Sequence, residues 1–291
     1  MTVCIAVACE SYSESDKSPY LIMVSDTLLS MGATSSEALK ARYLSYTWSV
    51  MLAGDDIAYA EDVITRARNN LKERSTTSLS DVVISITKAY KSVRIEQIEE
   101  QFLGSYNMDL SEFLAKGPDY PTPTRRQSLL DEIEKFDLGC EFLVAGFSSP
   151  TSGPYVFQIV NPGRYVPHSL VGYWAIGSGN INAITYLARR NQGTHSGFER
   201  SLYNAIAAKK LAEKAEGVGT KTTVYVLKRG ENKVEFLKKG IIDAIVQMWE
   251  DEEAKVQPSN LKARIKAILN PPATPSLPLN PAPEKSESEE K

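Results

Sequence analysis

The sequence predicts an α+β protein folded as a four-layer αββα sandwich, in which two stacked sheets lie between pairs of helices. Three observations support this prediction. Strand-like segments come in groups rather than singly between helices, which disfavours a doubly wound parallel sheet. Helix-like segments come in pairs after each group of strands. Short polar turns join neighbouring strands, as antiparallel hairpins require. The resulting order is strands, two helices, strands, two helices, strands.

The first half of the chain supplies one group of strands and one pair of helices. Small, β-branched and other apolar residues are concentrated in three segments, which predicts strands at 2–9, 21–25 and 48–53. The apolar residues from Ile57 to Leu71 recur at helical spacing, so a helix is expected there. Asp55 and Asp56 favour its start through the helix dipole. A second helix should begin near Ser80.

The second half of the chain repeats this arrangement. Apolar runs predict strands at 140–147, 155–160 and 171–176. Helical periodicity then predicts helices at 182–190 and 198–215. A closing hairpin is expected over 222–237, followed by a final helix over 241–252. Apart from the final helix, the predicted helices form two pairs, one for each outer face of a sandwich.

Composition excludes several classes of function. The chain has 291 residues, of which 42% are apolar and 24% charged, with a net charge of −3. Its balanced charge gives no footprint for nucleic acid, and no apolar run approaches the roughly 20 residues of a membrane helix. No basic region precedes the first apolar stretch, so a secretory signal is not expected. Three cysteines without a CxxC pair suit a reducing compartment. We therefore expect a cytoplasmic protein that binds neither nucleic acid nor membrane.

The domain organisation follows from where these patterns stop. One folded domain is expected over residues 1–252, with an insert near 100–137 where the helical pattern weakens and a Pro-rich loop intervenes. A helical extension is expected over 253–270. Residues 271–291 hold six of the fifteen prolines and end in a charged run, so we expect a disordered tail rich in Pro and Glu.

Thr2 is the strongest candidate for chemistry. Initiator methionine is commonly removed before small residues, so we expect Thr2 to become the N-terminus. An N-terminal Thr carries a hydroxyl and a free α-amine together, and such an amine has a pKa of roughly 7.7–8.0. The amine can then act as the base for its own hydroxyl. On its own, however, a Thr after Met is a common and usually inert feature.

The surrounding motifs resemble a known family. Residues 2–7 open a strand, 21–27 form a second strand ending near Asp26, Lys40 follows fourteen residues later, and Gly54 another fourteen residues on. Phe142–Phe147, Trp174–Gly179 and the glycine turn at 217–219 continue the pattern. Together these segments, which span most of residues 2–237, resemble proteasome β-subunits among the N-terminal-nucleophile (Ntn) hydrolases.

The resemblance implies a threonine peptidase that needs no metal or organic cofactor. Thr2 would be the nucleophile and its α-amine the general base. Lys40 would lie beside the hydroxyl and favour the alkoxide, while Asp26 would pair with Lys40 and keep it charged. Ser178 would form a hydrogen bond near the Thr2 amine. The backbone N–H of Gly54 would donate to the oxyanion, a contribution of roughly 3–4 kcal/mol.

Alternatives remain open at the sequence level. Taken singly, Asp26 could simply end a strand, Lys40 could be a surface charge and Ser178 could be part of a turn. The family has an Asp ahead of the late glycine turn, where this chain places Ala215; Glu213 or Glu216 could substitute. A non-catalytic structural subunit is therefore one alternative, and an Ntn amidohydrolase for small amides is another.

The family also implies partners. Its members form rings that enclose their sites, so a homo-oligomeric ring acting on peptides or unfolded protein chains is expected. An ATP-dependent unfoldase would then be a further partner.

Overall fold

The computed structural model describes residues 2–10, 18–31, 34–72, 77–117, 120–231 and 234–253. The chain divides into two compact units, Met1–Met248 and Trp249–Lys291. Of the second unit only 249–253 are described, so the expected helical extension beyond Glu253 and the expected tail over 271–291 lie outside the described residues. No helix in the described part of the chain is both long and apolar enough to cross a membrane.

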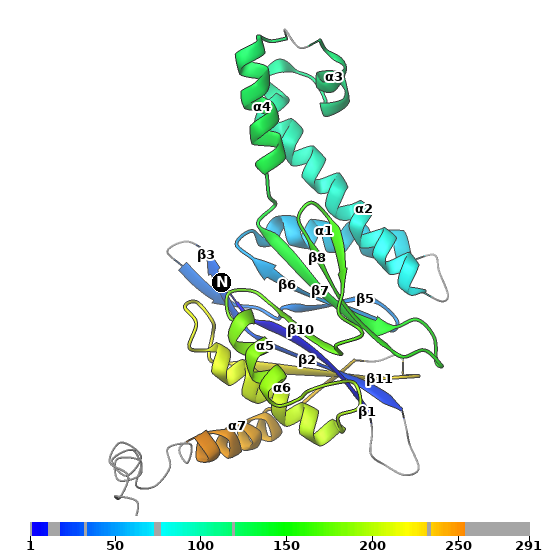
Figure 1. Cartoon of the computed structure of the whole chain (residues 1–291), viewed down its shortest axis with the longest axis vertical. Coiled ribbons are helices and arrows are strands. Elements are labelled where there is room, and N and C mark those ends of the chain that lie inside the picture. The colour runs from blue at the N-terminus through cyan, green and yellow to red at the C-terminus, as the bar shows by residue number, and fades with distance from the viewer. Residues whose placement is uncertain are drawn as a thin grey trace, which may run out of the picture. The chain divides into compact units, whose positions relative to one another are not determined.

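One antiparallel sheet contains the N-terminal strand. Its five strands run in the order β10-β1-β2-β11-β12, so β1 lies between a late strand and its own hairpin partner (Figure 1). In β1 every residue from Cys4 to Cys9 is buried, as in a strand covered on both faces. The strands are β1 (Cys4–Glu10), β2 (Pro19–Asp26), β10 (Tyr173–Ile176), β11 (Thr222–Lys228) and β12 (Val234–Phe236).

A second antiparallel sheet has the order β5-β6-β7-β8-β9. In its register Gly54, the last residue of β6, lies opposite Cys140, the first residue of β7. A separate two-stranded sheet, β3-β4, follows β2. The strands are β3 (Leu28–Met31), β4 (Thr34–Glu37), β5 (Ala41–Ser45), β6 (Trp48–Gly54), β7 (Cys140–Phe147), β8 (Pro154–Val160) and β9 (Arg164–Pro167).

An apolar cluster joins the two five-stranded sheets. It includes Cys4 and Met23 from the first sheet and Met51 and Leu143 from the second, all fully buried. Burial of such side chains contributes about 1.5–3 kcal/mol each. This contact holds the end of β6 close to the start of β1, which is where the candidate site lies.

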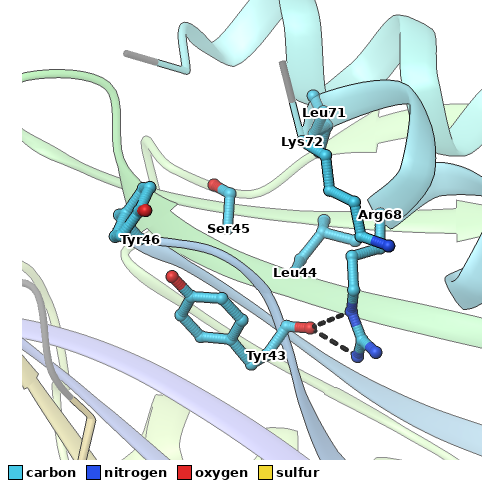
Figure 2. A pocket seen from close by; sticks show the side chains of 7 residues that line it. All are labelled: Tyr43, Leu44, Ser45, Tyr46, Arg68, Leu71 and Lys72. Carbon is cyan, nitrogen blue, oxygen red and sulfur yellow. Dashed lines mark hydrogen bonds between the residues drawn. The ribbon is translucent and has the colours of Figure 1, made fainter. Parts of the chain in front are cut away.

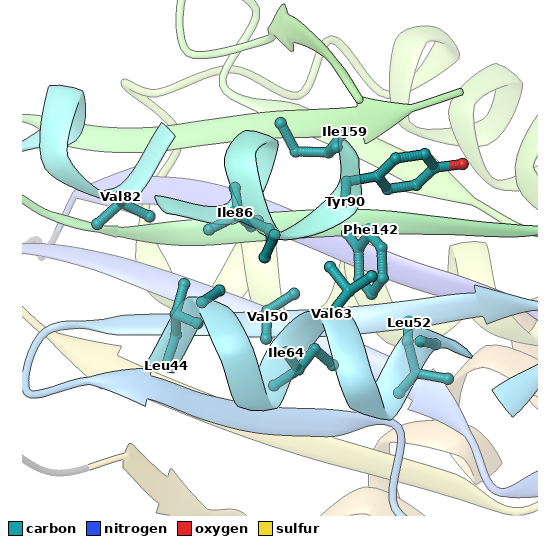
Figure 3. Close-up of a cluster of buried hydrophobic side chains, with 14 of the residues drawn as sticks. Leu44, Val50, Leu52, Val63, Ile64, Val82, Ile86, Tyr90, Phe142 and Ile159 are labelled. Carbon is teal, nitrogen blue, oxygen red and sulfur yellow. The ribbon is translucent and has the colours of Figure 1, made fainter. Parts of the chain in front are cut away.

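Helices α1 (Ile57–Leu71) and α2 (Leu79–Ile98) pack on the other face of the second sheet. Figure 3 shows this cluster, in which Tyr90 of α2 meets the ring of Phe142 edge-on at 6.2 Å. The Asp56 side chain caps the start of α1 by accepting hydrogen bonds from the backbone N–H groups of Ala58 and Tyr59. Ser78 and Asp81 form a capping box at the start of α2.

Helices α5 (Asn180–Arg189) and α6 (Phe198–Ala212) pack on the first sheet. Helix α7 (Lys239–Glu253) adds Ile242 to the same apolar cluster. The first sheet is therefore covered by side chains from three helices rather than from two.

The segment expected as an insert forms its own small core. A π-helical turn (Glu99–Leu103) and a 3-10 turn (Gly104–Tyr106) extend α2. Helices α3 (Leu110–Ala115) and α4 (Pro123–Lys135) then pack beside that end of α2, away from the sheets (Figure 1). Leu103, Phe113 and Leu129 are the buried residues of this core.

The four-layer αββα sandwich predicted from the sequence is wrong. The described residues form an α+β fold with two five-stranded antiparallel sheets, a further two-stranded sheet and seven α-helices. The prediction assigned helices to two outer pairs and treated 100–137 as an irregular insert. Instead α3, α4 and α7 add apolar faces that the pairwise scheme leaves out, and β3–β4 forms a hairpin outside both larger sheets.

Candidate active site

Thr2 lies at the entrance to β1 and is buried, with 2% of its surface exposed. Its backbone N–H donates to Ser178 Oγ at 3.3 Å. Its Oγ1 donates to Asp26 Oδ1 and accepts from Lys40 Nζ. The structure thus brings together four of the five residues predicted as the site, from segments up to 176 residues apart. Their catalytic roles stay predictions.

Asp26 and Lys40 form a buried ion pair, with 2.9 Å between Lys40 Nζ and Asp26 Oδ1. Asp26 is the last residue of β2 and is fully buried, while Lys40 precedes β5 and is 1% exposed. Neither charge is stable alone in such surroundings, so each requires the other. The expectation that Asp26 pairs with Lys40 matches this geometry.

Backbone donors complete the surroundings of the Asp26 carboxylate. The N–H of Val3 donates to Oδ1 at 3.0 Å. The N–H of Gly219 donates to Oδ2 at 3.0 Å, and that of Leu28 donates to the same oxygen at 3.3 Å. Hydrogen bonds to a charged acceptor are strong and hold it in one orientation. Oδ1 therefore faces Thr2 while Oδ2 faces the 219 turn.

Ser178 lies in the turn between β10 and α5, which rests directly on Thr2. Gly177 has φ +88°, and an added Cβ there would lie 2.4 Å from the carbonyl oxygen of Thr2. Only glycine combines this backbone conformation with this close approach. Ser178 Oγ lies 3.3 Å from that carbonyl oxygen and 3.2 Å from that of Glu216, and can donate to either. The hydroxyl thus links Thr2 to the segment that precedes Gly219.

Gly54 is the fifth predicted residue, and it lies apart from the four that contact one another around Thr2. It ends β6 with φ +146°, and a Cβ would lie 2.1 Å from the carbonyl oxygen of Gly139. Within the part of the chain that the structure describes, no hydrogen bond joins Gly54 to the other four residues. It lines a pocket of about 520 Å³ formed by the ends of β6, β7 and β8, together with Asp137, Gly139, Cys140, Glu141, Val160 and Asn161.

Glu141 connects this pocket to the turn on Thr2, and sequence reasoning missed it. Its Oε1 accepts the N–H of Gly177 at 2.8 Å, and its Oε2 accepts from Gln158 at 2.6 Å. Gln158 in turn accepts from the Trp174 indole at 3.1 Å. A lone carboxylate in the apolar run of β7 was the available signal, because such a residue needs a specific donor.

Lys209 is the second residue that sequence reasoning missed. Two adjacent lysines such as Lys209 and Lys210 are typical of a solvated helix face, yet Lys209 is fully buried. Its Nζ donates to the carbonyl oxygens of Gly219 and Thr220 at 2.9 Å each, and to Glu213 at 2.5 Å. Burial lowers its pKa, and Glu213 acts in the opposite direction. The surrounding run of alanines was the only sequence signal for burial.

His168 is one of the two histidines of the chain and is buried, with 7% of its surface exposed. Its ring stacks on Trp174 with 3.8 Å between centroids and an interplanar angle of 7°. Burial lowers its pKa to about 4, because desolvation opposes the charged form. The ring is therefore neutral near pH 7 and acts as a packing residue.

A further pocket of about 200 Å³ lies where β5 meets the end of α1. Figure 2 shows the Arg68 guanidinium donating to the carbonyl oxygen of Tyr43, at 3.0 and 2.7 Å. None of the five predicted site residues lines this pocket. This pocket is therefore lined by residues other than the group around Thr2.

The arrangement of the sheets and of the site allows comparison with known proteins. No protein-family model matches the chain, and no curated protein sequence matches it. Anbu from Yersinia bercovieri, described as an ancestral β-subunit, has a TM-score of 0.60, 14% identity and coverage of 89% of this chain and 100% of that chain. The fold is similar to that of Anbu. The Gly-1 mutant of Anbu from Hyphomicrobium sp. strain MC1 gives a TM-score of 0.59 and 11% identity, covering 90% and 100% of the two chains.

These matches correct the family assignment made from the sequence. The assignment to proteasome β-subunits is wrong, because no family model supports it and these structural neighbours are Anbu proteins. At 11–14% identity the likeness shows a proteasome-like, β-subunit-related fold and nothing beyond the fold.

Proposed function

We propose that the protein is a threonine peptidase that uses Thr2 as its nucleophile once Met1 is removed. One observation carries the proposal. The Thr2 hydroxyl touches both members of a buried Lys40–Asp26 pair, while its backbone nitrogen lies 3.3 Å from Ser178 Oγ. A buried ion pair costs solvation, so its contact with a hydroxyl suggests a chemical use. The Anbu-like fold is consistent with this activity.

Each group has a role in the proposed reaction. The free α-amine of Thr2 takes the hydroxyl proton as Oγ1 attacks the carbonyl carbon of the substrate. The Lys40 ammonium stabilises the developing alkoxide, and Asp26 holds Lys40 in place. Ser178 orients the amine. The N–H of Gly54 donates to the oxyanion from the adjoining pocket, which would hold part of the substrate.

The steps balance without a cofactor. Attack forms an ester between Thr2 Oγ1 and the acyl group of the substrate, while the peptide C–N bond breaks and the amine passes its proton to the leaving nitrogen. Water then adds to the ester carbonyl and gives its proton to the α-amine. The acid leaves, and a proton returns to Oγ1.

The intact mass of the purified full-length protein, before and after exposure to a peptide epoxyketone, tests the proposal. This reagent bonds to both the hydroxyl and the free amine of an N-terminal Thr. We expect loss of Met1 and one adduct. Thr2→Ala should form none, whereas Thr2→Ser, which keeps a hydroxyl, should still form one.

Two other outcomes would each replace the proposal. Retention of Met1, or its loss without an adduct, would indicate a structural subunit with an inert Thr2. Loss of Met1 with hydrolysis of small amides but not of a peptide panel would indicate an amidohydrolase. The contacts of Thr2 favour a reactive Thr2 over a structural subunit, and the substrate panel decides between the peptidase and the amidohydrolase.

Two further proposals accompany the activity. We propose a homo-oligomeric ring served by an ATP-dependent unfoldase, and light scattering of the purified protein tests the ring. We also propose a cytoplasmic location, supported by the three cysteines, which are all free and buried in this fold.

A further inference from the structure

A buried ammonium in α6 lies outside the group of residues proposed to react. Lys209 has no exposed surface, and it makes no direct contact with Thr2, Asp26 or Lys40 in the described structure. We infer that Lys209 is a positioning residue, which fixes the turn at Gly219–Thr220 and thereby the orientation of the Asp26 carboxylate beside Thr2. This inference rests on the proposed function.

The contacts of Lys209 account for its whole donor capacity. An ammonium has three N–H donors. These donors reach Gly219 O and Thr220 O, both at 2.9 Å, and Glu213 Oε1 at 2.5 Å. Lys210 Nζ lies 2.7 Å from the other oxygen of Glu213. Lys209 thus ties the last turn of α6 to two consecutive carbonyl groups of the following loop.

That loop carries one of the backbone donors to Asp26, in addition to those of Val3 and Leu28. The N–H of Gly219 donates to Asp26 Oδ2 at 3.0 Å, and the carbonyl oxygen of the same residue accepts from Lys209. The other carboxylate oxygen, Oδ1, meets Lys40 and Thr2. A carboxylate is planar, so the direction of one oxygen fixes the direction of the other. Movement of the turn would therefore rotate Oδ1 away from the nucleophile.

Close packing shows that the turn has little freedom. A Cβ on Gly219 would lie 2.6 Å from Leu28 Cβ and 3.1 Å from Asp26 Oδ2. Earlier in the same loop, the carbonyl oxygen of Glu216 lies 3.2 Å from Ser178 Oγ. The loop after α6 therefore contacts two of the three side chains that surround Thr2, Asp26 and Ser178, and Lys209 is the charged group that anchors this loop.

Replacement of Lys209 by Met tests this inference in the full-length protein. Lys210→Met is the matched control, because it removes the neighbouring contact with Glu213 but leaves both carbonyl contacts in place. Three readouts are compared: the rate of Thr2 modification by the epoxyketone, the hydrogen exchange of the Gly219 amide, and kcat and KM for a peptide substrate.

We expect Lys209→Met to slow modification at least tenfold and to speed exchange at Gly219 at least tenfold. Lys210→Met should stay within twofold of wild type in both. The KM for a peptide substrate should stay within threefold while kcat falls, because the turn does not line the pocket beside Gly54. A Lys209→Met protein that matches wild type in both rates would overturn the inference.

The exchange readout separates this inference from the proposed function. If wild-type Thr2 never reacts with the epoxyketone, the peptidase proposal fails, whereas faster exchange at Gly219 in Lys209→Met alone would still establish that Lys209 holds the turn. If Lys209→Met does not fold, Glu213→Gln is used instead, because it weakens the hold on Lys209 while keeping an acceptor. Faster Gly219 exchange in that variant would support the inference, and unchanged exchange would refute it.

Discussion

Gly177→Ala should destabilise the protein for two reasons, the backbone conformation of this residue and its close approach to Thr2. The residue lies between β10 and Ser178, with φ +88°. A Cβ at this position would lie 2.4 Å from the carbonyl oxygen of Thr2 and 2.8 Å from its Cγ2. Both obstacles belong to backbone or to a short, buried side chain, so neither can move aside easily.

The expected destabilisation follows from these two terms. A non-glycine residue in the left-handed region costs about 1–2 kcal/mol. Overpacking of a well-filled interior costs about 1–3 kcal/mol more. The free energy of unfolding should therefore fall by about 2–5 kcal/mol. If the protein folds, Thr2 must shift, and its reaction with an epoxyketone should slow along with the loss of stability.

Urea unfolding of three variants measures the two terms separately. Gly230 has φ +84° but nothing within 4 Å of an added Cβ, so Gly230→Ala should show only the backbone cost. Gly153 has neither obstacle, so Gly153→Ala should be nearly neutral. The predicted order of stability is Gly153→Ala, then Gly230→Ala, then Gly177→Ala.

The comparison of Gly177→Ala with Gly230→Ala tests whether the close approach to Thr2 contributes to stability. If Gly177→Ala is no less stable than Gly230→Ala, the contact between the turn and Thr2 contributes nothing. The close approach would then not be what holds Thr2 beside Ser178, and our account of the site geometry would be refuted.

Three further predictions concern buried polar groups. Lys40→Met should abolish the reaction of Thr2 and lower the free energy of unfolding by about 3–5 kcal/mol, because Asp26 is then buried without its cation. Adding Asp26→Asn should restore part of that stability but not the reaction. A Lys40→Met protein as stable as wild type would contradict this prediction. The pKa of His168 is about 4 in the folded protein against 6.5 in the unfolded chain, so its stabilising contribution is complete above pH 6.5 and is lost as the pH falls toward 4, by up to about 3 kcal/mol. His168→Phe should remove that part of the pH dependence of the melting temperature, whereas an unchanged slope would show that another group is responsible. Burial raises the pKa of all three thiols, so a thiol reagent at pH 8 should label them only after denaturation, and rapid labelling of the native protein would contradict the burial of Cys4, Cys9 and Cys140.

Much of the local structure could be predicted from the sequence. The apolar runs at Trp48–Gly54 and Cys140–Phe147 are strands, and helical spacing after Asp56 gave α1. These elements are governed by the pattern of their own residues. Short strands such as β9 were not predicted, because four half-exposed residues carry too weak a pattern.

The site residues were predicted in two ways. Thr2 was selected because it follows Met1, and Asp26, Lys40 and Ser178 were selected from the resemblance to proteasome β-subunits. The structure places these four residues in contact. The hydroxyl of Thr2 contacts Lys40 because the start of β1, the end of β2 and the start of β5 lie close together. Gly54 was selected from the same family resemblance, but in the structure it borders the adjoining pocket.

What the sequence alone determined was most of the longer strands and helices and the candidate nucleophile Thr2, since hydrophobic periodicity and residue chemistry are local properties. Only the tertiary structure decided how many helices cover each sheet, and that Lys209 is buried rather than solvated. The reason is physical: the cost of burying an ammonium is offset by carbonyl groups ten and eleven residues further along the chain, and by Glu213 on the next helical turn. The two carbonyl groups reach Lys209 only because the turn after α6 folds back toward the helix, and the sequence pattern does not show that turn.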